Sequence, residues 1–268
     1  MRLNPCLIKA MIITPQNWPY PRWMAHRGAG KLAPENTLAA FRLGAAHGYR
    51  MFECDVKLSA DGVPFLLHDD TLTRTTSGLI ASASPVAGDH PWSDLAQLDA
   101  GSWHSRAFAG EPLPSFENIA RFCLHNGFCL NIEIKPTTGL ARQTGQVVAQ
   151  HAARLWHNAD LPPLLTSFDP EALAAAREAE PQLPRGLLLE TLVEGWLATA
   201  LALQCVCIVC DHVLWDGNSV AQAQSAGFRC LSYTVNNAVE AQRLTDLGTD
   251  GLITDRIDLF APACQSVV

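Results

Sequence analysis

The sequence predicts an α/β fold, a closed parallel (β/α)₈ TIM barrel with a small insertion after its second strand. Eight short apolar runs alternate with segments of helical periodicity, and several of those segments end at a glycine. The runs are continuously apolar, as expected for barrel strands that are buried on both faces. A doubly wound open sheet is the alternative, because strand order cannot be deduced from a single sequence.

The predicted strands and helices follow one another in a regular order. The strands are expected at 23–28, 51–58, 129–135, 164–168, 185–190, 205–211, 229–235 and 251–255. The helices are expected at 35–47, 115–126, 140–157, 169–179, 194–203, 218–226 and 237–247. We expect residues 1–22 to form an N-terminal tail and residues 23–268 to form one domain.

Residues 59–114 interrupt this alternation. They hold an extended VPFLLHDD segment and a turn-rich stretch without a clear crossover helix. A loop that follows a barrel strand lies at the C-terminal face, where barrels build their active sites. We therefore expect this insertion to cap the site.

Composition and charge limit the possible functions and locations. The 268 residues include 48% hydrophobic and 17% charged residues, which suits one large globular domain. A formal net charge of −7 argues against nucleic acid as a partner. The most apolar stretch, 185–210, is interrupted by Glu190, Glu194 and Gln204, so no apolar run reaches the roughly 20 residues that a stable membrane span needs. The N-terminus makes a poor signal peptide, and nine cysteines, mostly in apolar runs, indicate reduced thiols in a cytoplasmic protein.

Charged residues occur where buried strands should be apolar. Glu53 and Asp55 lie two apart in the second strand, and Glu133 and Lys135 lie two apart in the third. This spacing places each pair on one face of its strand. Arg27 ends the first strand. Because buried ionised groups are costly unless paired or metal-bound, we expect these side chains to converge on one point.

Three carboxylates in neighbouring strands predict a site for one divalent cation. Hard oxygen ligands favour Mg²⁺ or Ca²⁺ over zinc. A divalent ion on Glu53, Asp55 and Glu133 together with Arg27 and Lys135 leaves one positive charge, which suits a small anionic substrate. A structural ion-pair network of the same five residues is the alternative.

Two histidines and one glutamate complete the candidate site. His26 and His68 lie where apolar runs end near the expected cluster, so they could act as a general acid and a general base. Glu35 would lie close to Arg27 and could orient it. In the same PENT segment, either Asn36 or Thr37 could cap the following helix.

The ordered motifs resemble those of the glycerophosphodiester phosphodiesterase family. They are HRG at 26–28, PENT at 34–37, ExD at 53–55, HDDTLTRTTSG at 68–78, DAGSW at 99–103, IEIK at 132–135, SF at 167–168, YTVN at 233–236 and DGLITD at 250–255. The resemblance runs from about residue 23 to residue 258, and the set is far more specific than any single motif. It implies a (β/α)₈ barrel that hydrolyses glycerophosphodiesters, such as glycerophosphocholine and glycerophosphoethanolamine, to glycerol 3-phosphate and an alcohol. The chain looks like the cytoplasmic bacterial branch.

The resemblance also implies residue roles. Glu53, Asp55 and Glu133 would be the metal ligands. His26 and His68 would be the acid–base pair. Arg27 and Lys135 would contact the phosphate, and Phe168 and Tyr233 would line the glycerol pocket. The family often has Trp at the position of Tyr233, and its usual proline after ITD is absent from DRID at 255–258, so these departures bear on substrate preference.

Three alternative functions remain open at this point. A lysophospholipase D-like enzyme or a cyclising phospholipase could use the same barrel, with an acyl channel under the insertion. A protein that binds phosphodiesters without turning them over is the third, and the presence of both histidines argues against it.

Overall fold

The computed structural model describes residues 13–14, 17–78, 84–260 and 262, and eight parallel strands form its centre. They are β1 (Trp23–Ala25), β2 (Met51–Leu58), β4 (Cys129–Ile134), β5 (Leu164–Ser167), β6 (Arg185–Leu189), β7 (Cys207–Asp211), β8 (Arg229–Tyr233) and β9 (Gly251–Thr254). β1 pairs in parallel with both β2 and β9, which closes the ring. The predicted barrel is therefore confirmed, and the open sheet is excluded.

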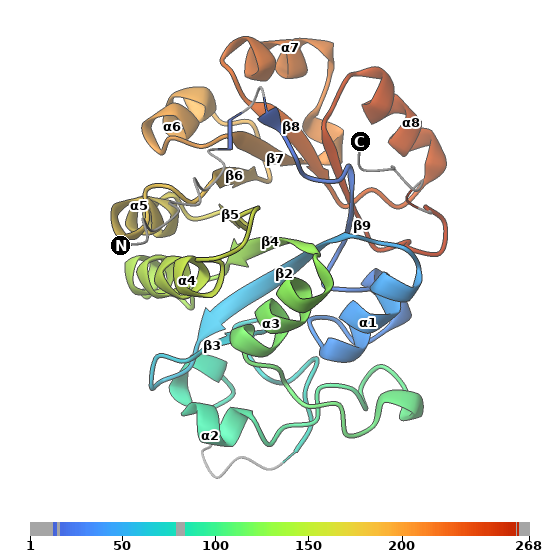
Figure 1. Ribbon diagram of the computed structural model, residues 1–268, viewed down its shortest axis with the longest axis vertical. Coiled ribbons are helices and arrows are strands. Elements are labelled where there is room, and N and C mark those ends of the chain that lie inside the picture. Colours follow the sequence, from blue (N-terminus) through green and yellow to red (C-terminus); the bar gives the residue numbers. More distant parts are fainter. Residues whose placement is uncertain (1–12, 15–16, 79–83, 261, 263–268) are drawn as a thin grey trace, which may run out of the picture.

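Helices surround the strands, as Figure 1 shows. They are α1 (Leu38–Ala46), α3 (Phe116–Asn126), α4 (Ala141–Leu155), α5 (Pro170–Ala179), α6 (Trp196–Ala202), α7 (Gly217–Ser225) and α8 (Ala238–Asp246). Side-chain caps explain where several begin: Thr37, Ser115 and Asn237 each accept a hydrogen bond from a backbone N–H of the first helical turn. Of the two candidate caps of α1, Thr37 fills the position.

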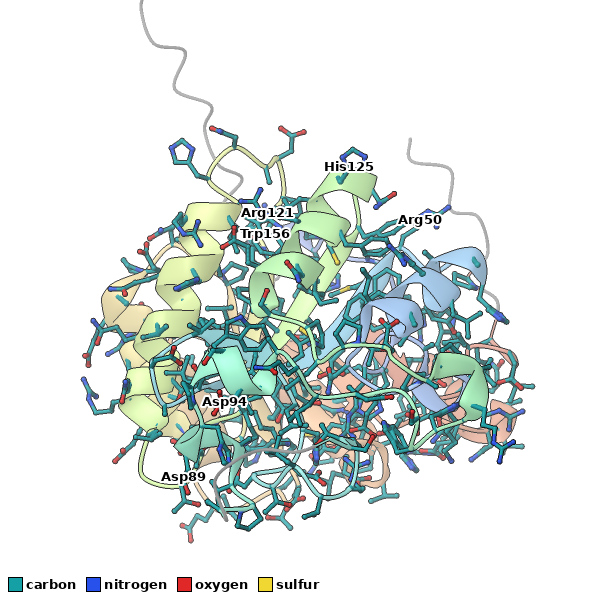
Figure 2. The ribbon with its side chains drawn as sticks, turned by 90° about the horizontal axis from the view of Figure 1, so that it is seen from below. Arg50, Asp89, Asp94, Arg121, His125 and Trp156 are labelled. Atoms are coloured by element: carbon teal, nitrogen blue, oxygen red, sulfur yellow. The ribbon has the colours of Figure 1, made fainter. Side chains whose placement is uncertain are left out.

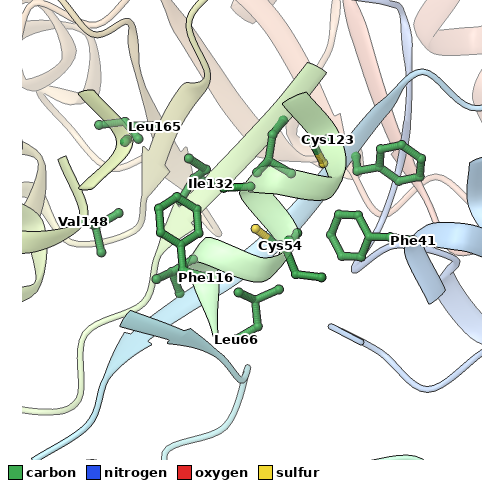
Figure 3. Packing of buried hydrophobic residues seen from close by; sticks show 14 of the residues in the cluster. Phe41, Cys54, Leu66, Phe116, Cys123, Ile132, Val148 and Leu165 are labelled. Carbon is green, nitrogen blue, oxygen red and sulfur yellow. The ribbon is translucent and has the colours of Figure 1, made fainter. Parts of the chain in front are cut away.

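The two faces of each barrel strand have different surroundings. Phe52, Cys54 and Val56 point outward into a core cluster shared with α1 and α3. Figure 3 shows Cys54 in this layer, together with Phe41, Phe116 and other apolar side chains of the surrounding elements. The alternate residues of β2 therefore point into the barrel, as the spacing of Glu53 and Asp55 predicts.

Part of the predicted tail closes the N-terminal end of the barrel. Ile13 and Tyr20 are buried in the cluster that holds Met24 and Met51 from the barrel interior. The Tyr20 hydroxyl donates a hydrogen bond of 2.9 Å to the Pro162 carbonyl. Residues 1–12 and 15–16 lie outside the described residues.

The insertion adds one antiparallel strand and a small core of its own. β3 (Pro64–Leu66) pairs with Val56–Leu58 of β2, beyond the point where β1 ends. The only α-helix among the described residues of the insertion is the short α2 (Trp92–Leu95). Over the ranges that the structure describes, the chain also forms the short 3₁₀ helices η2 (Gly30–Leu32), η3 (Ala87–Asp89), η4 (Arg106–Phe108) and η5 (His212–Leu214). Phe65, Leu95 and Leu98 are buried together in a separate cluster.

The insertion lies at the C-terminal end of the barrel. In Figure 2 its residues Asp89 and Asp94 lie at the opposite end from Arg50 and His125. Arg50 directly precedes β2, so it marks the N-terminal end of the strands. Within the part of the chain that the structure describes, every helix is too short or too polar to cross a bilayer.

Candidate active site

Three buried carboxylates meet inside the barrel, two from the first five residues of β2 and one from the C-terminal end of β4. One oxygen each from Glu53, Asp55 and Glu133 lies within 4.8 Å of the others. The register of the strands explains this proximity, because Asp55 is the direct neighbour of Glu133 across the β2–β4 pair. The structure therefore brings the three predicted acids together.

Asn36 holds Asp55 in place. The Asn36 amide donates a 2.8 Å hydrogen bond to Asp55 Oδ2, and its Oδ1 accepts one of 3.1 Å from the Asp55 backbone N–H. Asn36 has a left-handed backbone (φ 59°), which costs energy for a residue other than glycine. Its orienting contacts with Asp55, rather than helix capping, account for its side chain.

Two cations flank the carboxylates. Arg27 Nε lies 3.2 Å from Asp55 Oδ2, and its backbone N–H donates to Glu53 Oε2 at 3.0 Å. Lys135 Nζ lies 2.8 Å from Glu133 Oε1 and 3.8 Å from Asp55 Oδ1. The charged groups predicted from strand spacing therefore form one cluster.

The carboxylates do not all favour ionisation. Burial raises the pKa of Glu53 well above its usual value, and the neighbouring Asp55 and Glu133 raise it further. Burial, followed by repulsion from Asp55, raises the pKa of Glu133 to about 7. Burial acts on Asp55 in the same direction, but Arg27 and Lys135 outweigh it and lower the pKa of Asp55 to about 2. If all three carboxyls were ionised, their charge of −3 would exceed the +2 of Arg27 and Lys135, so without a further cation Glu53 and Glu133 tend to keep a proton.

These residues fit a divalent cation. Among the described residues, Glu53 Oε1 and Asp55 Oδ1 are buried and lack a hydrogen-bond partner. A buried carboxylate oxygen without a partner is costly, and a bound cation would supply one. An all-oxygen donor set is the kind that Mg²⁺ and Ca²⁺ prefer.

Each candidate histidine is held by an aspartate through its Nδ1. His26 Nδ1 lies 2.6 Å from Asp255 Oδ1, and His68 Nδ1 lies 2.8 Å from Asp69 Oδ1. Burial tends to raise the pKa of Asp255, but the His26 hydrogen bond and charge lower it to about 2. Burial also lowers the pKa of His68. Because an ionised carboxylate only accepts hydrogen bonds, Nδ1 is the donor in each pair when the imidazole is neutral, and Nε2 is left for other partners.

The pairing of β1 with β9 places Asp255 beside His26. Gly30, in the turn after β1, has φ +56°, and a Cβ atom there would come within 2.2 Å of the Asp255 Cα. Only glycine allows this turn to approach the end of β9 so closely. Asn236 also binds Asp255, donating from Nδ2 to Oδ2 at 2.9 Å.

Glu35 lies beside Arg27, as predicted. Its Oε1 is 2.8 Å from Arg27 Nη1. Arg74 of the insertion reaches the same carboxylate, with Nη1 at 2.7 Å from Oε2. Burial tends to raise the pKa of Glu35, but its hydrogen bonds and ion pairs with Arg74 and Arg27 lower it overall.

Several of these groups line one cavity of about 200 Å³. Its lining includes both histidines, Arg27, Glu53, Glu133 and Lys135 on one side. Phe168, Leu188, Glu190 and Tyr233 line the other side. The rings of Phe168 and Tyr233 meet edge to face, with centroids 5.6 Å apart, and Lys135 Nζ lies 5.4 Å from the Phe168 centroid.

Sequence reasoning missed four residues that support the site. Asp255, Asp69 and Arg74 received no role there, and Asn36 was considered only as a helix cap, although all four lie in the motifs DGLITD, HDDTLTRTTSG and PENT. Asp255 follows the apolar run GLIT, so its place at a strand end is the same signal that identified His26. Asp69 and Arg74 lie in irregular segments of the insertion, where no strand or helix periodicity predicts a direction.

Comparisons with known proteins agree with this geometry. The chain matches the model of the glycerophosphoryl diester phosphodiesterase family over residues 26–259. A glycerophosphodiester phosphodiesterase of Caldanaerobacter subterraneus is 30% identical over 233 residues, which cover 87% of this chain and 93% of that protein. Among solved structures, an Oleispira antarctica phosphodiesterase in complex with the product sn-glycerol 3-phosphate has a TM-score of 0.80 and 32% identity, covering 88% of this chain and 93% of that one. A glycerophosphodiester phosphodiesterase of Agrobacterium tumefaciens has a TM-score of 0.75 and 26% identity, covering 91% and 100%.

Proposed function

Because the chain belongs to the glycerophosphoryl diester phosphodiesterase family and is such an enzyme, we propose that it cleaves its substrates with one divalent cation held by Glu53, Asp55 and Glu133. The products are sn-glycerol 3-phosphate and an alcohol. The observation that carries the proposal is the cavity lined by Glu53, Glu133, two cations and two histidines at the C-terminal end of the barrel, with Asp55 completing the group of three buried acids.

The cation is Mg²⁺ or Ca²⁺, in view of its three carboxylate ligands. When bound, it supplies a Lewis acid that polarises a phosphoryl oxygen. The side chains of Arg27 and Lys135 contact the non-bridging oxygens of the phosphodiester. These fixed cations stabilise the charge that develops on the phosphoryl group in the transition state.

His26 and His68 move the protons. One imidazole accepts a proton from the nucleophile, which is water or the glycerol 2-hydroxyl, and the other donates a proton to the leaving alkoxide. Attack by water gives glycerol 3-phosphate directly, whereas attack by the 2-hydroxyl gives a cyclic phosphate that water must then open by breaking the new P–O bond. Asp255 and Asp69 support this assignment, because each occupies the Nδ1 of its histidine and leaves Nε2 for the reacting groups. The two aspartates act by setting the orientation and the tautomer of the rings.

The far side of the cavity supports glycerophosphocholine and glycerophosphoethanolamine as substrates. Glu190 follows β6 and lines the cavity together with Phe168 and Tyr233. A carboxylate beside two aromatic rings attracts an ammonium group. The phosphate of a zwitterionic diester would face Arg27 and Lys135, while its cationic alcohol would face Glu190. Phe168 and Tyr233 would then contact the glycerol and the alcohol.

The remaining parts of the proposal concern location and phospholipid substrates. We place the enzyme in the cytoplasm of a bacterial cell, and the seven free cysteines among the described residues are consistent with a reducing compartment. A lysophospholipase D-like or cyclising activity would need room for an acyl chain, and the small cavity favours a water-soluble diester.

A coupled assay for glycerol 3-phosphate tests the function. The panel contains glycerophosphocholine, glycerophosphoethanolamine, glycerophosphoglycerol and lysophosphatidylcholine, each with and without chelator. We expect turnover of the first two, loss of turnover with chelator, and recovery with added Mg²⁺ or Ca²⁺. The Glu190→Gln variant should raise the KM for the two cationic diesters by about tenfold, on the order of one ion pair, and leave glycerophosphoglycerol unchanged.

The same panel separates the alternatives when choline, lysophosphatidic acid and cyclic phosphate are measured beside glycerol 3-phosphate. Turnover of lysophosphatidylcholine would indicate the lysophospholipase activity, and a cyclic phosphate product would indicate the cyclising one. Binding of glycerophosphocholine without any product would show a protein that only binds phosphodiesters. An equal loss on all diesters in Glu190→Gln would remove the cation-binding role of that residue.

A further inference from the structure

Arg74, in the insertion, forms a forked bridge between two loops of the site. Its Nη1 and Nη2 donate to Glu35 at 2.7 and 2.8 Å, while Nε and Nη2 donate to Asp69 at 2.7 and 2.9 Å. Glu35 lies in the loop after β1, and Asp69 lies in the loop after β3. One guanidinium therefore ties together two segments that belong to different parts of the chain.

Each of these two carboxylates holds a residue of the proposed machinery. Glu35 Oε1 accepts a hydrogen bond of 2.8 Å from Arg27 Nη1. Asp69 Oδ1 lies 2.8 Å from His68 Nδ1. Arg74 is thus connected through Glu35 to Arg27, the proposed phosphate contact, and through Asp69 to His68, a proposed acid–base residue.

Stability alone does not account for this arrangement. The Arg74 side chain is 44% exposed, and ion pairs of half-exposed arginines contribute little to folding free energy. The planar guanidinium group of arginine presents its N–H donors in a fixed geometry, so it sets both the distance between the two carboxylates and their relative orientation. Lysine carries the same charge but has no rigid fork, so it cannot hold both carboxylates in one plane.

We propose that Arg74 is a positioning residue that sets the His68 imidazole and the Arg27 guanidinium at the same time. It touches neither the phosphodiester nor a metal ligand in this role. The bridge makes the insertion part of the active site, because the hydrogen bonds of Arg74 join the loop that carries His68 to the loop that carries Arg27. This inference rests on the proposed roles of His68 and Arg27.

Steady-state kinetics on glycerophosphocholine, with cation present, test the proposal. Arg74→Ala should lower kcat through the His68 arm and raise KM through the Arg27 arm, for a combined loss of about 10- to 100-fold in kcat/KM, the range measured for residues that orient a functional side chain. Arg74→Lys should fall between wild type and Arg74→Ala. Asp69→Ala should lower kcat, and adding Arg74→Ala to it should lower kcat no further, because both act through one imidazole.

Arg121→Ala is the matched control. Arg121 also binds a carboxylate, Glu117, through two nitrogens, but it lies on α3 at the opposite end of the barrel from the insertion (Figure 2). Its kcat and KM should stay within about twofold of wild type. Thermal melting of every variant separates a kinetic loss from unfolding.

The outcomes distinguish this inference from the proposed function. If His68→Ala is inactive but Arg74→Ala keeps wild-type kcat and KM, the positioning role is wrong and the function stands. If Arg74→Ala melts far below wild type, Arg74→Lys decides instead: wild-type kinetics in that variant would overturn the need for the fork. Full activity in His68→Ala would contradict the proposed function itself.

Discussion

The two sides of the cavity differ in how their side chains are held. On the side of β1, β2 and β4, nearly every charged group has an identified partner at hydrogen-bond distance, as with Asn36 on Asp55 and Asp255 on His26. On the side of β5, β6 and β8, Phe168 and Tyr233 are held by ring packing and one hydrogen bond from the Tyr233 hydroxyl to the Leu189 carbonyl. Chemistry needs atoms fixed to a fraction of an ångström, whereas an apolar contact surface tolerates small shifts. We infer that the side chains from β1, β2 and β4 carry out the reaction and call this half of the cavity the reacting side. Those from β5, β6 and β8 determine which substrate binds, and we call this half the selecting side.

The largest effect should come from the carboxylates of the reacting side. Glu53→Gln keeps the shape of the side chain but removes one ligand charge, so we expect loss of the bound cation and a fall in kcat/KM of about a thousandfold or more. Metal analysis of the purified variant and the glycerol 3-phosphate assay measure both. Glu190→Gln, which removes a carboxylate from the other side, should retain the cation. Wild-type metal content in Glu53→Gln would contradict the ligand set.

The second largest loss of activity should come from replacing either histidine. His26→Ala and His68→Ala should each lower kcat by about 10²- to 10⁴-fold, the usual contribution of a general acid or base, while metal content stays at the wild-type level. Activity near wild type in either variant would refute its role. A simultaneous loss of metal would mean that the histidine supports the cation site rather than proton transfer.

On the reacting side, removal of the cation should make the free energy of unfolding depend on pH. The raised pKa of Glu53 means that the folded protein keeps a proton which the unfolded chain releases above about pH 4.5. Stability from this group therefore falls as the pH rises. In chelator, the melting temperature of wild type relative to that of Glu53→Gln should fall as the pH is raised from 5 to 8. Saturating Mg²⁺ or Ca²⁺ should remove this dependence, and a rise in the difference with pH would contradict it.

The smallest effect should come from the selecting side. Phe168→Ala removes an aromatic surface that is 37% exposed at the cavity, and we expect KM to rise about tenfold with kcat nearly unchanged. Val239→Ala is the control, because Val239 is an 82% exposed apolar residue outside the cavity lining. If Phe168→Ala lowered kcat as much as the histidine variants do, the proposed division of roles between the two sides would be wrong.

Local patterns predicted the barrel and much of the site. Continuous apolar runs identified the strands, and spacing of two placed Glu53 and Asp55 on one face of β2, where the structure has them. Boundaries differed by a few residues: the helix expected at 194–203 spans Trp196–Ala202. The insertion was located correctly, but its contribution of Arg74 and Asp69 was not predicted, because turns carry no periodicity from which a direction can be deduced.

The sequence by itself determined the strand–helix order, the inward face of each strand and the chemistry of the residues there, since these depend on the neighbours of each residue along the chain. Only the tertiary structure decided which distant residues meet. Asp255 reaches His26 because closure of the ring pairs β9 with β1, and Arg74 reaches Glu35 because β3 folds back along β2. Such contacts join residues far apart in the chain, so they depend on the closed geometry of the barrel and not on any local pattern.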